Sequence, residues 1–207
     1  MAITIDAISG SGAKSNVSSF TWNHTCAANT ILVVTASGYD AAGGTSVSGV
    51  TYNGVALTKQ LDSLTNSNQI TTSIWKLNTP ATGTHAIVVT FSASGYDWTS
   101  GGAVSFFGGL GTTGNTGTYF LSGTPSITVT TTTGSLVVDS IFNAQQPITC
   151  GQTQIQQANI NSDSSASSYK IATTNSTVMS WTGAGQCAQT AVEFLATRTG
   201  GSLLWLM

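Results

Sequence analysis

The tetrapeptide Ser-Gly-Tyr-Asp occurs twice, at residues 37–40 and 94–97, and each copy follows an apolar run that is typical of a strand. Hydrolysis of a glycosidic bond uses two carboxylates that flank the scissile bond. Asp40 and Asp97 would form such a pair if the two loops were neighbours. Asp is also common in turns, because its side chain accepts hydrogen bonds from nearby backbone amides. We favour the turn interpretation, and we expect no catalytic residues here.

The same two loops also carry aromatic residues that would suit a sugar. Tyr39, Tyr96 and Trp98 accompany the two aspartates, and aromatic rings stack on the apolar faces of sugars while carboxylates bind the hydroxyls. A glycan site built from these residues is one hypothesis. The alternative is that the rings pack in or at the rim of the core, as large aromatic side chains commonly do.

Metal and cofactor sites receive little support from the sequence. A calcium site at Asp40, Asp97 or the segment 161–165 would need six or more oxygen ligands, and the spacing of a calcium-binding loop is absent. No nucleotide-binding glycine motif stands between a strand and a helix. Cys26, Cys150 and Cys187 form no CxxC pair, so they are interpreted as buried small side chains, with one disulfide plus a free thiol as the alternative. We predict no metal and no cofactor.

His24 and His85 both stand at strand-like positions. A hydrolytic triad would need a histidine, an acid and a nucleophile that converge from different strands, and no Ser-containing elbow accompanies either histidine. We therefore interpret both histidines as structural.

Alternating and β-branched segments predict the elements that must position these residues. Examples are the segments 3–8, 30–38, 84–92 and 135–143, while helical periodicity is nearly absent. Asn53-Gly54, between two alternating segments, predicts a type I′ hairpin turn. The sequence thus predicts an all-β fold: a single jelly-roll-like antiparallel sandwich of about a dozen strands over residues 1–198, with negligible helix.

The charge content limits the partners of the protein. Charged residues make up 6% of the chain, with five basic and seven acidic side chains. A nucleic-acid-binding surface needs a basic stripe, so nucleic acid is excluded as a partner. No apolar run approaches the length of a membrane-spanning helix, and the first ten residues predict a strand rather than a secretory signal.

Several segments together resemble a known type of domain. They are FTWNHTC, ILVVTASGYD, VSGVTYNGVALTK, SIWKLNTPATGTHAIVVTFS, GGAVSFFG, GSLVVDS, MSWTGAG and AQTAVEFLA. In this order, over roughly residues 1–196, they resemble a jelly-roll-type β-sandwich domain found in bacteriophage structural proteins and in uncharacterised bacterial surface proteins. The resemblance implies the fold and a role in virions or surface assemblies, and it supplies no catalytic residues.

Residues 199–207 lie outside that resemblance. Two glycines and a serine precede an apolar run that we expect to dock on a partner, and its members are Leu203, Leu204, Trp205, Leu206 and Met207. The alternative is that this tail folds back on its own sandwich and covers an open edge.

We expect a non-enzymatic virion structural protein, either a head decoration or minor capsid protein or a tail or fibre component. Such a protein is made in the host cytoplasm and binds other virion proteins or further copies of itself. A carbohydrate-binding adhesin at a cell surface is the alternative.

Overall fold

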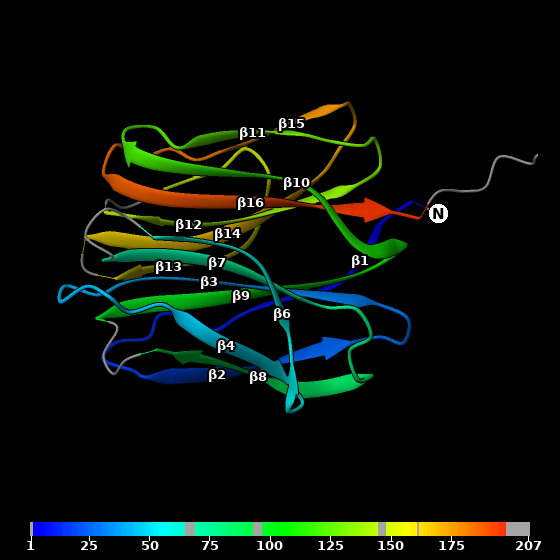
Figure 1. Ribbon diagram of the computed structural model, residues 1–207, viewed down its shortest axis with the longest axis horizontal. Coiled ribbons are helices and arrows are strands. Elements are labelled where there is room, and N and C mark those ends of the chain that lie inside the picture. Colours follow the sequence, from blue (N-terminus) through cyan, green and yellow to red (C-terminus); the bar gives the residue numbers. More distant parts are fainter. Residues whose placement is uncertain (1, 65–68, 93–96, 145–147, 161, 198–207) are drawn as a thin grey trace, which may run out of the picture.

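The computed structural model describes residues 2–64, 69–92, 97–144, 148–160 and 162–197. These residues form sixteen antiparallel strands and no helix, so the all-β sandwich predicted from the sequence is confirmed. The strands are more numerous than the predicted dozen. They stack as four sheets, one above another (Figure 1).

The four sheets are numbered in the order of the stack, beginning from the lowest layer in Figure 1. Sheet I contains, in order, β2 (Ser19–Cys26), β8 (Gly83–Phe91), β4 (Val47–Tyr52) and β5 (Val55–Ala56). Sheet II contains β1 (Thr4–Gly10), β9 (Trp98–Phe107), β3 (Ile31–Tyr39), β7 (Ile70–Leu77) and β6 (Thr58–Leu64). Sheet III contains β10 (Gly109–Ser122), β16 (Gln186–Ala196), β12 (Leu136–Asn143), β14 (Asp163–Ile171) and β13 (Thr153–Ile160). Sheet IV contains β11 (Ser126–Thr130) and β15 (Ser176–Ser180).

Sheets I and II together have the strand order of a jelly roll. Eight jelly-roll strands divide into one sheet with the order 1-8-3-6 and a second with the order 2-7-4-5. The orders β1-β9-β3-β7 and β2-β8-β4-β5 match this pattern, with β6 as an extra edge strand. The jelly-roll part of the predicted fold is therefore found within residues 4–107.

Sheets III and IV repeat the same order with the second half of the chain. The orders β10-β16-β12-β14-β13 and β11-β15 correspond strand for strand to the first half, except that the β4–β5 hairpin has no counterpart. The register repeats as well, because Ile31 pairs with Phe106 in sheet II and Leu136 pairs with Phe194 in sheet III. Residues 4–107 and 109–196 are thus two copies of one topology, which the sequence did not predict.

The two halves pack through sheets II and III in a reciprocal manner. Strand β1 lies against β13 and its counterpart β10 lies against β6, while β7 contacts β16 and β9 contacts β14. Reciprocal contacts of this kind characterise a two-fold symmetric interface between identical subunits. The chain is therefore built like a dimer joined into one polypeptide.

Apolar side chains fill each of the three spaces between the sheets. Val34, Val50 and Ile87 are buried between sheets I and II, and Val137 and Met179 are buried between sheets III and IV. The middle core contains the sheet II and sheet III side chains Ile31, Val33, Val104, Phe106, Leu136, Val138, Val192 and Phe194. Burial of this apolar surface is the main force that holds the stack together.

Local turn chemistry agrees with the sequence at the hairpin between β4 and β5. Asn53 and Gly54 have φ values of 49° and 74°. Positive φ at both central positions is what a type I′ turn requires, and Asn-Gly meets that requirement with little strain. The predicted turn is confirmed. The described residues contain no helix that could cross a membrane.

Candidate functional site

The structure brings the two Ser-Gly-Tyr-Asp loops to the same end of sheet II. Tyr39 at the end of β3 pairs directly with Trp98 at the start of β9. Both rings are half-buried, and Tyr39 stacks on Phe142 of sheet III with 6.1 Å between ring centroids. The rings therefore form part of the rim of the core and keep part of their surface in solvent. Tyr96, the third predicted aromatic, lies outside the described residues.

The two aspartates of these loops accept hydrogen bonds from a single turn. Asp40 is 4% exposed, and it accepts hydrogen bonds from the Ala42 amide at 3.0 Å and from the Thr45 hydroxyl. Asp97 accepts a hydrogen bond from the Ala41 amide at 2.7 Å. The aspartates are neighbours, as a catalytic pair would require, but their oxygens bind the backbone of the loop after β3. This is the turn role that the sequence favoured.

His24 belongs to a chain of hydrogen bonds that the sequence did not reveal. The Trp22 indole donates to Ser9 Oγ at 3.0 Å, and Ser9 Oγ lies 2.8 Å from His24 Nδ1. On the other side of the ring, His24 Nε2 lies 3.1 Å from Ser105 Oγ, whose hydroxyl donates to Asp6 Oδ2 at 2.7 Å. With a neutral ring, as its lowered pKa implies, one set of donors satisfies all four contacts: Ser9 donates to His24 Nδ1, and the Nε2 proton is donated to Ser105.

This hydrogen-bond network contains a hydroxyl, an imidazole and a carboxylate, which are the groups of a hydrolytic triad. Burial lowers the pKa of His24 to about 4, against a smaller opposing effect of Asp6, so the ring is neutral near pH 7. Ser9 Oγ already accepts the Trp22 proton and donates its own, and the Asp6 carboxylate also accepts the Ala27 amide at 3.0 Å. The network joins β1, β2 and β9, and it links sheet I to sheet II at their common edge.

A second buried carboxylate, Asp139, lies between sheets III and IV and is fully enclosed. It accepts hydrogen bonds from Ser168, from the Trp181 indole at 2.7 Å and from the Gln189 amide at 2.7 Å. Burial raises the pKa of Asp139 to about 6 in spite of these donors. Since its partners come from β14, from β16 and from Trp181, the residue that follows β15, Asp139 connects the two sheets.

In both halves of the chain, a carboxylate accepts hydrogen bonds from the turn that joins the second strand to the next, and Glu193 is the acid of the second half. Its carboxylate accepts the Thr132 amide at 2.5 Å and the Ser135 hydroxyl at 2.7 Å, in the turn that joins β11 to β12. Asp6 does the same for the turn between β2 and β3 through the Ala27 amide. The carboxylate belongs to β16 in the second half and to β1 in the first half. In the first half, Ser105 of β9 stands at the position that corresponds to Glu193.

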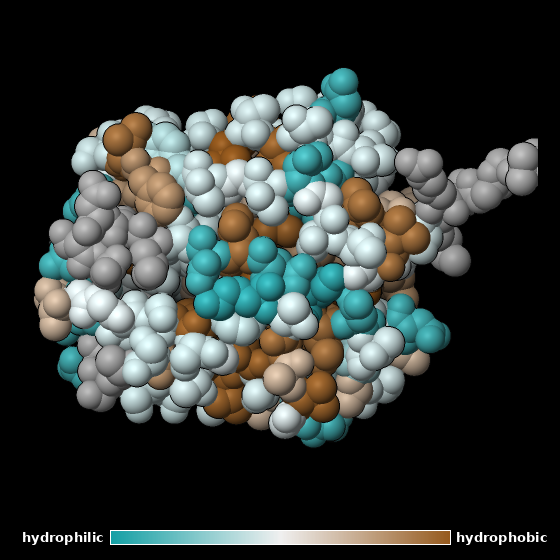
Figure 2. Space-filling model, viewed as in Figure 1, coloured by the Kyte–Doolittle hydropathy of each residue, from teal (hydrophilic) through white to brown (hydrophobic). Residues whose placement is uncertain are grey.

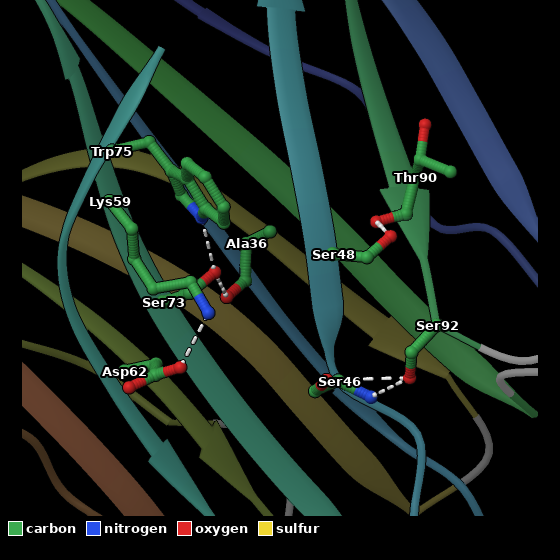
Figure 3. A network of polar contacts seen from close by, with 9 residues as sticks. All are labelled: Ala36, Ser46, Ser48, Lys59, Asp62, Ser73, Trp75, Thr90 and Ser92. Carbon is green, nitrogen blue, oxygen red and sulfur yellow. Dashed lines mark hydrogen bonds and ion pairs between the residues drawn. The ribbon is translucent and has the colours of Figure 1, made fainter. Parts of the chain in front are cut away.

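One exposed acid forms the ion pair shown in Figure 3. Lys59 on β6 pairs with Asp62 at 2.7 Å, and its ammonium lies 5.1 Å from the centroid of the Trp75 ring. The Trp75 indole in turn donates to Ser73 at 3.0 Å. An ammonium over an indole face is a favourable cation–π contact.

Strand β10 is the feature of the described surface best suited to binding another chain. It is an edge strand of sheet III, fourteen residues long and without a charged residue. Three large apolar side chains on it are exposed: Leu110 by 48%, Phe120 by 37% and Leu121 by 68%. Apolar side chains also reach the surface at several places in the view of Figure 2.

A surface pocket of about 510 Å³ opens at the other edge of sheet III. Ile5 of β1 and Tyr169 and Ile171 of β14 form its apolar walls, and Lys170 and the segment 151–153 complete it. Ile171 is 37% exposed. The pocket lies where sheets II and III meet, since Ile5 and Tyr169 both border the middle core.

The predicted docking residues Leu203, Leu204, Trp205, Leu206 and Met207 lie outside the described residues. Residue 161 of the segment considered for calcium also lies outside them, whereas residues 162–165 are described. Among the residues that are described, no group of three or more His, Cys, Asp or Glu side chains is placed to hold a metal. In the same part of the chain the three cysteines are free thiols, and Cys26 and Cys187 are buried.

Comparison of the chain with models of protein families, with curated proteins and with solved structures finds no match.

Proposed function

We propose that this protein is a non-enzymatic structural component of a bacteriophage virion that docks on neighbouring subunits. It serves as a head decoration or minor capsid protein, or as a tail or fibre component. The apolar tail Leu203–Met207 supplies part of the binding surface, and other virion proteins or further copies of the chain are the partners.

The observation that carries the proposal is the open edge of β10. Unpaired backbone groups along an edge strand are a template for another strand, and soluble proteins commonly block such edges with charges or proline. Strand β10 has neither, and its register shifts against β16 lie before Thr116. From Thr116 to Ser122 the register is continuous, and Phe120 and Leu121 are exposed there. A building part whose edge is covered after assembly has no need of such protection.

The positions of the acids support the same function. Asp6, Asp40, Asp97, Asp139 and Glu193 all accept hydrogen bonds from the chain's own backbone or side chains. Their carboxylates stabilise turns and join sheets. These five acids thus hold the body rigid, which is what a structural component requires.

Light scattering on the purified full-length chain tests the proposal. We expect self-association or binding to virion components that weakens in a Leu121→Lys variant and in a variant lacking residues 200–207. Val55→Lys is the matched control, because Val55 is exposed by 52% on the far outer sheet. A full-length chain that stays monomeric and binds no virion component would contradict the proposal.

A carbohydrate-binding adhesin is the second candidate, and the half-exposed Tyr39–Trp98 pair favours it. Adjacent aromatic rings at the rim of a sandwich can stack on a sugar, with Asp97 beside them. A glycan array probed with the full-length chain tests this function. Binding that disappears in Trp98→Ala and persists in Leu121→Lys would support it, whereas an array without any bound glycan would exclude it.

A further inference from the structure

The pocket beside β14 and Thr197, the last described residue, lie at the same end of sheet III. Leu136 of β12 pairs with Phe194 on one side and with Ile171 on the other. Because neighbouring strands are about 4.8 Å apart, Ile171 and Phe194 are separated by about 10 Å across the sheet. The tail follows Thr197, three residues beyond Phe194.

Thr197, the last described residue, is held on the side of β16 that is farther from the pocket. The amide and hydroxyl of Thr197 both donate to the Gly108 carbonyl, at 2.7 Å and 3.1 Å. Gly108 directly precedes β10, which lies on one side of β16, whereas the pocket lies on the other side, beyond β12. The hydrogen bonds at Thr197 therefore hold the last described residue beside the start of β10, with β16 and β12 between β10 and the pocket strand β14.

The pocket has the chemistry to receive an indole with aliphatic neighbours. Its volume of about 510 Å³ lies in the range of sites that bury small ligands or large side chains. Ile5, Tyr169 and Ile171 offer apolar contact, and the exposed Lys170 can place an ammonium over an aromatic ring. The protein already uses this arrangement where Lys59 lies over Trp75 (Figure 3).

We infer that the pocket formed by Ile5, Tyr169, Lys170 and Ile171 binds Trp205 from the tail of a second copy of this chain. This inference rests on the proposed function and names the receiving surface. Ten residues, 198–207, follow the described end of β16, and an extended segment of that length spans about 33 Å. Since the pocket and Thr197 lie at one end of sheet III, two copies that meet end to end would exchange their tails reciprocally. Such an exchange gives a closed, two-fold symmetric dimer.

Disulfide trapping in the full-length chain tests the inference. The variant Ile171→Cys/Leu204→Cys, in a Cys150→Ser background, places thiols on the pocket wall and beside Trp205. After oxidation we expect a covalent dimer on a non-reducing gel. The matched control Val178→Cys/Leu204→Cys carries its cysteine at a position exposed by 42% on sheet IV, and it is expected to stay monomeric. An internally bridged monomer, equal trapping in the control, or no trapping at all would overturn the inference.

Light scattering separates failure of this inference from failure of the proposed function. We expect Trp205→Ala and Ile171→Asp each to weaken the dimer at least about tenfold. If deletion of residues 200–207 abolishes association while Ile171→Asp does not, the pocket is the wrong receptor and tail docking stands. If the deletion leaves association unchanged, tail docking itself is wrong.

Discussion

The rings of Phe106 and Phe194 meet in the middle core with their centroids 6.0 Å apart and an angle of 60° between their planes. They occupy corresponding positions of the two halves, because Phe106 pairs with Ile31 and Phe194 pairs with Leu136. Each half thus contributes a phenylalanine from the equivalent position of the equivalent strand to the contact. The pair marks the internal two-fold relationship of the fold.

We expect each of these rings to be essential for stability. Phe106 and Phe194 are 0% and 2% exposed, so replacement of either by Ala should lower the free energy of unfolding by about 3–5 kcal/mol. Urea denaturation of the two single variants and the double variant measures their coupling, which we expect to be about 0.5–1.5 kcal/mol. Phe120→Ala, on the exposed edge, is the control with a smaller loss. Strict additivity of the two core substitutions would contradict a direct contact.

Asp139 should make the protein more stable at mildly acidic pH. Burial raises the pKa of its carboxyl to about 6 in the folded chain, above the value of about 4 for an unfolded chain. The folded state therefore binds the proton more tightly, and this contribution to stability is complete below pH 4 and is lost as the pH rises through 6.

In Asp139→Asn we expect the free energy of unfolding to depend less on pH between pH 4 and 6. The variant should also lose about 1–3 kcal/mol at pH 7, because its amide faces the Trp181 and Gln189 donors. Urea unfolding at several pH values measures both effects, and an unchanged slope in the variant would assign that pH dependence to other groups.

His24 should have the opposite effect on stability. Its pKa in the folded chain is lowered to about 4, while an unfolded histidine titrates near 6.5. The folded state binds this proton less tightly, so the contribution is complete above pH 6.5 and is lost as the pH falls toward 4. The loss amounts to about 3 kcal/mol at its limit. We expect His24→Gln to lose less stability than the wild type between pH 7 and 4.5. His85→Gln, on the paired strand β8, is the control. Parallel profiles for wild type and His24→Gln would show that His24 does not carry the effect.

Gly117 should tolerate no side chain, although its φ is ordinary for a strand. A Cβ atom at this position would lie 2.4 Å from Cγ2 of Ile127, a buried residue of sheet IV. We expect Gly117→Ala to cost about 1–3 kcal/mol in thermal or urea unfolding. Gly49→Ala is the matched strand control, because nothing lies within 4 Å of its added Cβ. Equal stability of the two variants would mean that β10 and β11 separate easily.

Local patterns in the sequence were sufficient for the fold class and for the turn at Asn53-Gly54. The internal repeat escaped because the corresponding strands share little beyond core-facing residues, such as Val104 with Val192 and Phe106 with Phe194. Both copies of Ser-Gly-Tyr-Asp lie in the first half, so this visible repeat does not mark the duplication. A comparison of residues 103–106 with 191–194, where Ala, Val and Phe recur at the same spacing, was the available signal.

The candidate sites depended on contacts between distant strands. The sequence placed Asp40 and Asp97 in turns, and the structure shows them binding one loop. Nothing local connects Ser9 or Ser105 to His24, because Ser105 comes from a strand 81 residues away. The pocket escaped for the same reason, as Ile5 and Tyr169 belong to different sheets.

The absence of a counterpart to the β4–β5 hairpin leaves the stack with a four-stranded outer sheet on one side and a two-stranded outer sheet on the other. The middle of the molecule looks alike from either direction, but its two outer faces do not. A binding partner that recognises one outer face therefore binds the sheet stack in a single orientation. Within a regular array, this difference gives every copy a defined inside and outside.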